Sequence, residues 1–345
     1  MARIFYGVMG DSRGHLSRSQ AVAQHMPEHE YLFAGGGTVP ELREQGFAVL
    51  DLPMVHTVLR DNKVDVWATI KNSGRVFLNK KKIVGELAEK IEAFDPDLIL
   101  CDYEYFTPLA ARKLGRPCVS LDHQHVLTHT RYEYPPGERF NRFTTCAIIR
   151  RLFTKCDRYL VSSFFAPPSI QDNVEVLPPV LRKVVFAHVP SQGEHVLVYV
   201  RGGSLEWTRD MCEQLGRPCI VYGFGDRPGQ GDITFRANSK HGFLADLSSA
   251  TYVISNAGHS LLSESLFFGK PVFCFPTKMF YEQYLNAWFL AKEGLGAFAN
   301  HGTDAGPLKR FEERLGDYRA AVQARDFMGN DVIAARITEL LRQES

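Results

Sequence analysis

The feature that most constrains this chain is an alternation of short apolar, β-type runs with segments of helical period, repeated in both halves. In the first half the pattern predicts strands at residues 4–9, 31–34, 48–52, 97–101 and 118–121, and helices at 17–26, 39–45, 64–94 and 108–114. In the second half it predicts strands at 196–200, 219–222, 251–255 and 271–275, with helices that start near 260 and 282. Strands that alternate with helices in this way are typical of parallel α/β sheets.

The chain is long enough to form two such sheets. It has 345 residues, and each half opens with a strand that runs into a glycine-containing turn. Residues 178–195 hold three prolines and no clear periodicity, so we place the linker there. The sequence therefore predicts an α/β protein of two Rossmann-like domains, 1–180 and 181–330, that face each other across a cleft. Residues 331–345 are expected to form a helix that can pack back on the first domain.

The net charge, the cysteine spacing and the length of the apolar runs argue against several classes of protein. The formal net charge is +1, which provides no overall field for nucleic acid. The seven cysteines are scattered without a CxxC pair or a Cys/His cluster, so no zinc site is indicated. No apolar run reaches the roughly 18 residues of a membrane-spanning helix. We expect a cytoplasmic protein, for which any membrane contact would be peripheral and at the inner face.

One segment suits such a contact. Residues 63–82 interleave aromatic and aliphatic side chains with six lysines and arginines, and an exposed helix of this kind can lie in an anionic membrane interface. The alternative is a helix that packs on the core and keeps a solvated basic flank.

The first candidate site follows the first strand, in Gly10-Asp11-Ser12-Arg13-Gly14-His15. Ligands of open parallel sheets bind beyond the carboxyl ends of the strands. The spacing is not that of the GxGxxG dinucleotide fingerprint, which makes a dehydrogenase a weak interpretation. A histidine side chain can accept a proton from an attacking hydroxyl at neutral pH, and His15 is the candidate for that role. Asp11 or Asp102 could orient it, or serve as the base instead; a helix-capping or merely exposed histidine is the simpler alternative.

The second candidate site is the stretch 255–264, Ser-Asn-Ala-Gly-His-Ser-Leu-Leu-Ser-Glu, which joins a predicted strand to a predicted helix. Backbone amides at the start of that helix would receive a diphosphate, with His259 and Ser260 as further donors. Glu264 can accept hydrogen bonds from two vicinal hydroxyls of a ribose. A carboxylate near a helix start is also an ordinary partner of the helix dipole.

The sequence around this stretch resembles the donor-binding signature of glycosyltransferases with the GT-B fold. It is similar both to UDP-sugar-dependent transferases of small molecules and to the N-acetylglucosaminyltransferase that makes peptidoglycan lipid II. In those families a glycine precedes a ribose-binding glutamate by six residues, as Gly258 precedes Glu264 here. An acidic residue and a glutamine, followed by Asn-Ala, then contact the sugar. Glu282, Gln283, Asn286 and Ala287 match that element.

The resemblance extends to other parts of the chain, more closely over residues 195–300 than in the first half. Gly242-Phe243-Leu244 resembles the segment that holds the uracil, and Arg201-Gly202-Gly203-Ser204 resembles the glycine loop that approaches the phosphates. Gly14-His15 resembles the Gly-His pair of the family's catalytic or acceptor-side histidine, and residues 96–102 resemble its "PDL…D" strand.

Three departures from the family pattern bear on the donor. Asn256 stands where plant-type members carry a phosphate-binding histidine, and His259 stands in place of their tryptophan. The tryptophan that stacks on uracil is absent, and Phe243 is its candidate substitute. The identities of the base and of the sugar therefore do not follow from the resemblance.

Two acidic motifs could suggest a metal. Asp95-Pro96-Asp97 spells DxD but precedes a strand, so we interpret it as a turn and strand start. Asp122-His123-Gln124-His125 offers no third convergent ligand and is expected to line the acceptor site or simply to follow a strand. The resemblance implies catalysis without a metal or other cofactor.

The resemblance implies a transferase that moves a sugar from a UDP-sugar, or less readily a dTDP- or GDP-sugar, to an acceptor hydroxyl with inversion. The nucleotide-sugar would be a co-substrate, and the acceptor could be lipid-linked, a polysaccharide or a small molecule. A non-hydrolysing UDP-sugar epimerase and a non-catalytic nucleotide-sugar-binding protein are the alternatives. Nucleic acid is not an expected partner.

Overall fold

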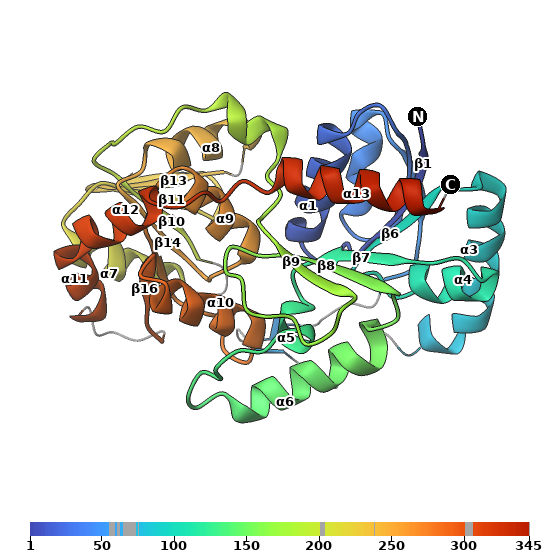
Figure 1. The fold of residues 1–345 in the computed structure, drawn as a ribbon. Helices are drawn as coiled ribbons and strands as arrows, with labels where there is room; N and C mark the ends of the chain where they lie inside the picture. Colours follow the sequence, from blue (N-terminus) through green and yellow to red (C-terminus); the bar gives the residue numbers. More distant parts are fainter. Residues whose placement is uncertain are drawn as a thin grey trace. The chain divides into compact units, whose positions relative to one another are not determined.

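The computed structural model describes residues 1–54, 59–60, 63–64, 74, 76–200, 204–237, 239–300 and 306–344. Contacts between residues divide the chain into two units. The first comprises Met1–Arg60, Val64–Lys183 and Met328–Ser345, and the second comprises Val184–Phe327 with the short segment Asp61–Lys63. Each unit contains one seven-stranded sheet (Figure 1).

The sheet of the first unit is wholly parallel, in the order β3-β2-β1-β6-β7-β8-β9. Its strands are β1 (Arg3–Val8), β2 (Glu30–Gly35), β3 (Ala48–Asp51), β6 (Leu98–Asp102), β7 (Val119–Asp122), β8 (Arg158–Ser162) and β9 (Val174–Leu177), and β4 (Leu59–Arg60) and β5 (Lys63–Val64) form a separate pair. Its helices are α1 (Arg13–His25), η1 (Val39–Gln45), α3 (Lys80–Phe94), α4 (Thr107–Leu114), α5 (Val126–His129), α6 (Arg139–Ile148), η2 (Ile149–Phe153) and α13 (Asn330–Glu344).

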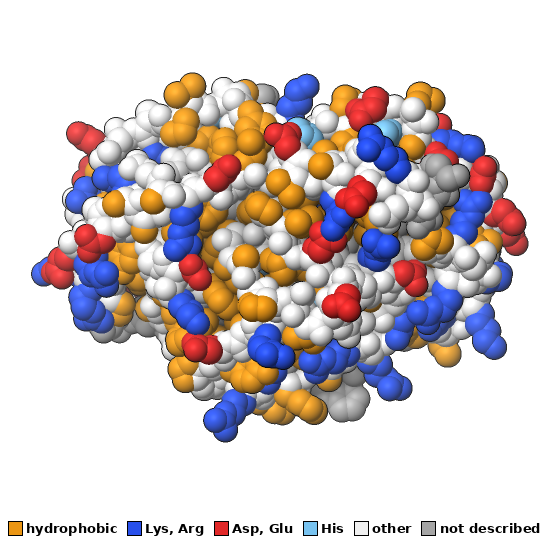
Figure 2. Space-filling view, in the orientation of Figure 1, with side chains coloured by type: hydrophobic (Ala, Val, Ile, Leu, Met, Phe, Trp, Pro, Cys, Tyr) orange, Lys and Arg blue, Asp and Glu red, His pale blue; other side chains and the backbone are white. Residues whose placement is uncertain are grey.

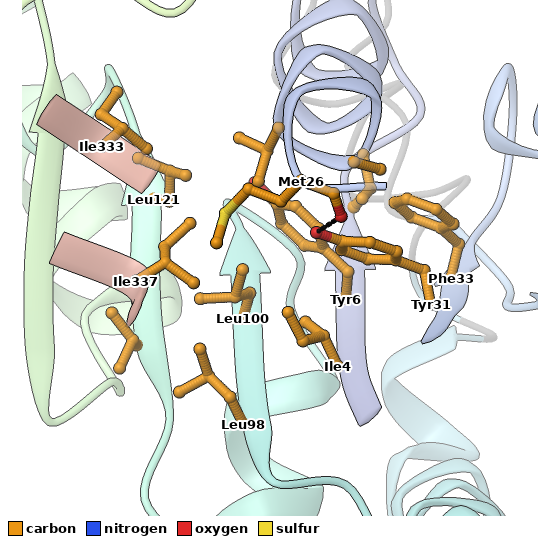
Figure 3. Packing of buried hydrophobic residues seen from close by; sticks show 14 of the residues in the cluster. Ile4, Tyr6, Met26, Tyr31, Phe33, Leu98, Leu100, Leu121, Ile333 and Ile337 are labelled. Carbon is orange, nitrogen blue, oxygen red and sulfur yellow. Dashed lines mark hydrogen bonds between the residues drawn. The ribbon is translucent and has the colours of Figure 1, made fainter. Parts of the chain in front are cut away.

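Side chains on the two faces of β1 define the layers of this unit. Ile4, Tyr6 and Val8 pack against α1 and α13, the C-terminal helix, through residues such as Met26, Ile333 and Ile337 (Figure 3). Phe5 packs on the opposite face against α3 and α4. Because both faces are covered, the strand is continuously buried after Arg3 rather than alternating between buried and exposed residues.

The sheet of the second unit has the order β12-β13-β11-β10-β14-β15-β16, parallel except for the edge pair β12–β13. Its strands are β10 (Val196–Tyr199), β11 (Cys219–Tyr222), β12 (Arg227–Gln230), β13 (Ile233–Arg236), β14 (Tyr252–Ser255), β15 (Val272–Cys274) and β16 (Gly296–Phe298). Its helices are α7 (Leu205–Leu215), α8 (Lys240–Ser249), α9 (His259–Phe267), α10 (Tyr281–Lys292), α11 (Gly306–Glu313) and α12 (Leu315–Gln323), with η3 (Lys183–Ala187) at the boundary.

Two helix predictions are wrong at their starts. The expected helix 64–94 is wrong at Val64, which belongs to β5, a strand that pairs with β4. Residues 74 and 76–78 are helical, α3 follows from Lys80, and residues 65–73 and 75 lie outside the described residues. Helix α1 starts at Arg13, four residues before the expected start, with Ser12 in extended conformation as its N-cap. His15 therefore lies in the first turn of a helix and not in a loop.

Candidate active site

In each sheet, the early strands are added on one side of the unit's first strand and the later strands on its other side. In the first unit the reversal lies between β1 and β6, and in the second it lies between β10 and β14. Loops at such a switch point diverge to opposite faces of the sheet and leave a crevice for ligands. His15 and Asp102 border the first switch point, and the turn 255–258 borders the second.

At the first switch point His15 and Asp102 form a buried pair. The last residue of β6, Asp102, lies beside Val8 of β1, and its side chain is fully buried. Nδ1 of His15 lies 2.7 Å from Asp102 Oδ1, and no hydrogen bond to a described residue uses the other ring nitrogen, Nε2. With Nδ1–H donating to the carboxylate, Nε2 is left as the proton acceptor of a neutral imidazole.

Arg18 completes this group, and the sequence interpretation missed it. It lies one helical turn after His15, and its Nε and Nη2 donate to the two carboxylate oxygens of Asp102 at 2.8 Å and 2.7 Å. Burial of the guanidinium opposes its charge, but Asp102 outweighs this and raises the pKa of Arg18. Residues three apart are neighbours on a helix surface, so a helix predicted from Arg13 would have placed His15 and Arg18 side by side.

A buried tyrosine lies close to the same carboxylate. Burial, and after it the charge of Asp102, raises the pKa of Tyr6 well above its usual value. The Tyr6 hydroxyl has no hydrogen-bond partner among the described residues. Tyr6 is therefore a neutral phenol in the folded protein.

Tyr103 covers the histidine ring. The two rings stack with centroids 5.8 Å apart and planes 9° apart, and Tyr103 also stacks on Phe153 at 4.1 Å. The backbone of Tyr103 has a φ of 55°, a left-handed conformation that is uncommon for a bulky residue. A strained residue directly after Asp102 is expected where surrounding contacts fix the backbone for function.

The other acidic and histidine candidates of this unit lie apart or pair among themselves. Asp11 is exposed in the loop before α1. Asp122 receives a hydrogen bond from Nδ1 of His125 at 2.6 Å, whereas Nδ1 of His123 bonds the carbonyl of Ser162 at 2.9 Å. Burial alone would raise the pKa of Asp122, but His125 lowers it below its usual range. Within the described residues no three His, Cys, Asp or Glu side chains are arranged to hold a metal ion.

At the second switch point the turn after β14 is held by three hydrogen bonds. The Ser255 hydroxyl accepts from the Ala257 amide at 3.1 Å, and the Asn256 side chain donates to the Phe275 carbonyl at 2.9 Å. Asn286, wholly buried on α10, donates to the Ala257 carbonyl at 3.1 Å. Ala257 has a φ of 63°, so these bonds hold a backbone conformation that alanine seldom adopts.

Helix α9 begins directly after this turn, with Gly258 as its N-cap. The first amides of an α-helix have no partner within the helix, and they point out of its N-terminal end with the positive end of the dipole. His259 is the first helical residue and is buried, and Ser260 is half-buried. The end of the helix therefore offers a place for an anionic group.

Glu264 lies on the same helix, buried, in its second turn. A carboxylate there is too far along the helix to serve chiefly as the partner of its dipole, which acts within the first turn. The two polar candidates on α10 are half-buried, and Gln283 Oε1 accepts from the Thr277 amide at 3.0 Å beyond the end of β15; Glu282 precedes it.

The remaining predicted donor residues have different surroundings. Ser204 is the N-cap of α7 and accepts from the Trp207 amide at 3.0 Å, and Gly202 and Gly203 lie outside the described residues. Phe243 packs its ring against Tyr222, with centroids 4.9 Å apart. Leu244 is completely buried, so only its backbone could contact a ligand.

Comparison with known proteins identifies the class. The model of glycosyl transferase family 1 matches residues 2–316, and the chain belongs to this family. An uncharacterized glycosyltransferase of Methanosarcina acetivorans is 23% identical over 331 residues, which cover 87% of this chain and 86% of the relative. One from Methanosarcina mazei is also 23% identical and covers 99% of this chain and 98% of its own. The protein is a glycosyltransferase.

Solved structures support the fold. The glycosyltransferase of kitacinnamycin superposes with a TM-score of 0.68 at 18% identity, covering 98% of this chain and 99% of that one. Phytolacca americana UGT2, solved with UDP-2-fluoroglucose and pterostilbene, gives 0.69 at 12% identity and covers 99% and 100%. VinC, solved with dTDP, gives 0.62 at 17% identity and covers 99% of each chain. The prediction of two Rossmann-like α/β units of the GT-B class is confirmed. No described helix is long and apolar enough to cross a membrane.

Proposed function

We propose that the protein transfers a sugar from a UDP-sugar, or another nucleotide-sugar, to an acceptor hydroxyl with inversion and without a metal. The observation that supports this proposal most strongly is the kind of side chain and backbone found at each of the two switch points. One holds an oriented histidine, and the other holds a fixed turn that leads into a helix N-terminus with a buried glutamate on the same helix.

On the donor side, the diphosphate would lie at the N-terminus of α9. Negative charge grows on the diphosphate as the glycosidic bond breaks, and fixed amides stabilise such charge without reorganising. The three hydrogen bonds to Ser255, Asn256 and Ala257 hold the turn in place before the donor binds. Glu264 would accept hydrogen bonds from the two ribose hydroxyls, and Glu282 and Gln283 would contact the sugar.

On the acceptor side, Nε2 of His15 would take the proton of the attacking hydroxyl. Asp102 is fully buried and already accepts two hydrogen bonds from Arg18, so it orients His15 and stabilises the imidazolium rather than acting as the base itself. Asp11 is exposed in the loop before α1, whereas the Asp102 side chain is buried against His15. The attack of the oxygen on the anomeric carbon forms one bond as the bond to the diphosphate breaks.

The known complexes support a nucleotide-sugar donor without fixing its base. The Phytolacca protein was solved with a UDP-sugar analogue and VinC with dTDP. A screen of UDP-, dTDP- and GDP-sugars by thermal shift would identify the donor, because a ligand of the folded state raises the unfolding temperature.

The reaction is tested with the donor found in that screen. Nucleotide diphosphate release is measured with and without a panel of lipid-linked, polysaccharide and small-molecule hydroxyl acceptors, and the glycosylated product is identified by mass spectrometry. The proposal predicts release that depends on an acceptor and equals product formed. Epimerised sugar without an acceptor, or binding of the donor with no turnover on any acceptor class, would contradict it.

A further inference from the structure

Helix α6 and the π-helical turn η2 carry an unusual apolar stripe. Phe140 is 69% exposed, Phe143 is 71% exposed and Ile148 is 49% exposed. With exposed Ala147 they recur at the i, i+3, i+7, i+8 spacing of one helix face. Exposed hydrophobic residues that stand singly are normal, but a stripe of two phenylalanines and an isoleucine on one face indicates an interaction surface.

The opposite face of the same segment anchors it to the unit. Cys146 and Ile149 are buried, and Phe153 at the end of η2 belongs to the core cluster that covers β1 and β6. The Cys146 thiol also points to the Leu127 carbonyl, 3.5 Å away. The stripe therefore lies on a helix that is packed in place, with its apolar residues directed outward.

The flanks of the stripe are basic. Arg139, Arg150 and Arg151 are exposed on either side of it, and the sequence has no Asp or Glu between residues 139 and 156. Arg142 lies over the ring of exposed Tyr134, 3.3 Å from its centroid. In Figure 2, blue Lys and Arg side chains alternate with orange hydrophobic ones along the lower edge, where Figure 1 shows α6.

We propose that this α6 surface, which consists of Phe140, Phe143, Ala147 and Ile148 with the flanking arginines, docks on an anionic lipid bilayer. Apolar side chains of an interfacial helix enter the boundary between headgroups and acyl chains, and the arginines around them attract anionic headgroups. A second copy of the chain is a poorer occupant. A two-fold dimer through this face would bring the arginines of one copy near the like-charged arginines of the other.

The surface also has a structural route to the first switch point. Phe153, at the end of the docked segment, stacks on Tyr103 at 4.1 Å, and Tyr103 stacks on His15 at 5.8 Å. Docking itself goes beyond the transfer reaction and does not depend on it. Its consequence, that the acceptor is a lipid-linked hydroxyl presented at the bilayer surface, rests on the proposed function.

The membrane contact predicted at residues 63–82 is a separate matter, because residues 65–73 and 75 lie outside the described residues. In the described remainder, Phe77 packs against the Tyr105 ring, with centroids 5.5 Å apart, and Val76 also packs on the core. Both side chains are partly buried, whereas the neighbouring Leu78 is 85% exposed, so the contact at residues 63–82 stays a prediction.

The test is co-sedimentation with vesicles in the absence of donor and acceptor, so its result does not depend on catalysis. Vesicles of phosphatidylcholine alone are compared with vesicles that also contain phosphatidylglycerol. We expect the wild type to bind the anionic vesicles at least about tenfold more tightly, and to be released by salt. Absence of binding to the anionic vesicles would overturn the proposal.

Variants locate the contact. Phe140→Ser with Phe143→Ser should lower vesicle affinity about tenfold or more. Arg150→Gln with Arg151→Gln should lower it roughly 20- to 30-fold, since each basic residue near an anionic surface contributes about fivefold. The control is Val189→Ser with Val332→Ser, which removes exposed apolar side chains elsewhere; those residues are 83% and 46% exposed.

Two outcomes of the variant series would overturn the proposal. One is vesicle binding by the phenylalanine variant that equals that of the control variant, with both shown to be folded by circular dichroism. The other is a wild type that forms a dimer by size-exclusion chromatography and ignores vesicles, while the phenylalanine variant is monomeric. That result would assign the α6 surface to self-association.

Discussion

Both sheets reverse their direction of strand addition beside their first strand, but the turns at the two switch points are built from opposite kinds of residue. In the first unit the space after β1 and β6 holds three ionisable side chains, His15, Asp102 and Arg18, locked together by short hydrogen bonds. In the second, the turn after β14 has no charged residue and relies on backbone amides. A proton acceptor must be oriented and electrostatically supported, whereas a leaving diphosphate needs fixed, uncharged donors.

The difference also explains how each turn is stabilised. The first is held by ion pairing in a fully buried place, where the loss of one partner leaves a charge uncompensated. The second is held by neutral hydrogen bonds around Ala257, which has a positive φ: the Ser255 hydroxyl accepts from its amide, and the Asn256 and Asn286 side chains donate to backbone carbonyls. Substitutions at the first site should therefore change turnover and stability, whereas substitutions at the second should change the affinity for the donor.

The largest expected effect is on turnover. His15→Ala should lower kcat by about 10²- to 10⁴-fold, the usual contribution of a general base. Its affinity for UDP, measured by calorimetry, should stay within about twofold of wild type, because His15 is proposed to act on the acceptor and not to bind the nucleotide. The matched control is His25→Ala at the other end of α1, which should turn over normally. If His15→Ala matches the control, the base lies elsewhere.

The next effect is on stability. Arg18→Met should lower the free energy of unfolding by about 3–5 kcal/mol, because it leaves the Asp102 carboxylate buried and unpaired by the guanidinium. Urea unfolding measures it, with Arg13→Met on the exposed side of the same helix as the control. Adding Asp102→Asn to Arg18→Met should recover part of the loss. If the effects of Arg18→Met and Asp102→Asn simply add in the double variant, the pair is not energetically coupled.

A smaller effect is expected on donor affinity. Glu264→Ala should weaken UDP binding by about 1.5–3 kcal/mol, or roughly 10- to 150-fold, as hydrogen bonds to a charged group are lost. Glu313→Ala, an exposed glutamate on α11, is the control. The thermal stability of both should be checked in the absence of ligand. Unchanged affinity in calorimetry would remove the ribose role from Glu264.

The smallest effect concerns pH. Burial, and then neighbouring His125, lowers the pKa of His129 to about 4. The unfolded chain, with a pKa near 6.5, then binds more protons than the folded one between about pH 4 and 6.5, so stability falls as the pH falls through that window. His129→Phe keeps the ring contact with Tyr159 and should flatten this fall by at most about 1.4 kcal/mol per pH unit. An identical slope of unfolding free energy against pH in the two proteins would refute this assignment.

Much of this comparison could be predicted from the sequence, because short apolar runs and glycine turns mark the carboxyl ends of parallel strands. The strands that carry Asp102 and Ser255 were predicted to within one residue of their observed ends. Arg18 was missed because the start of α1 was placed after His15, and no pattern in one sequence shows that two side chains converge on a third from a distant strand. The positive φ of Tyr103 and of Ala257 is likewise a product of tertiary contacts, since neither residue favours it.

The exposed stripe on α6 shows a different limit. Its sequence, RFNRFTTCAI, has helical periodicity on both faces, and only the packed structure shows which apolar face remains uncovered. The basic-aromatic composition of residues 63–82 predicts an exposed helix equally well, and there the described aromatic residue Phe77 packs partly against the core while Leu78 is exposed.

The central claim is that backbone amides at the start of α9 hold the nucleotide's diphosphate, with Glu264 on its ribose. A crystal structure of the protein soaked in UDP tests this directly. The account predicts diphosphate density against the amides that follow Gly258 and ribose hydroxyls within hydrogen-bond distance of Glu264. UDP bound at any other position, with that helix end occupied only by solvent, would contradict it.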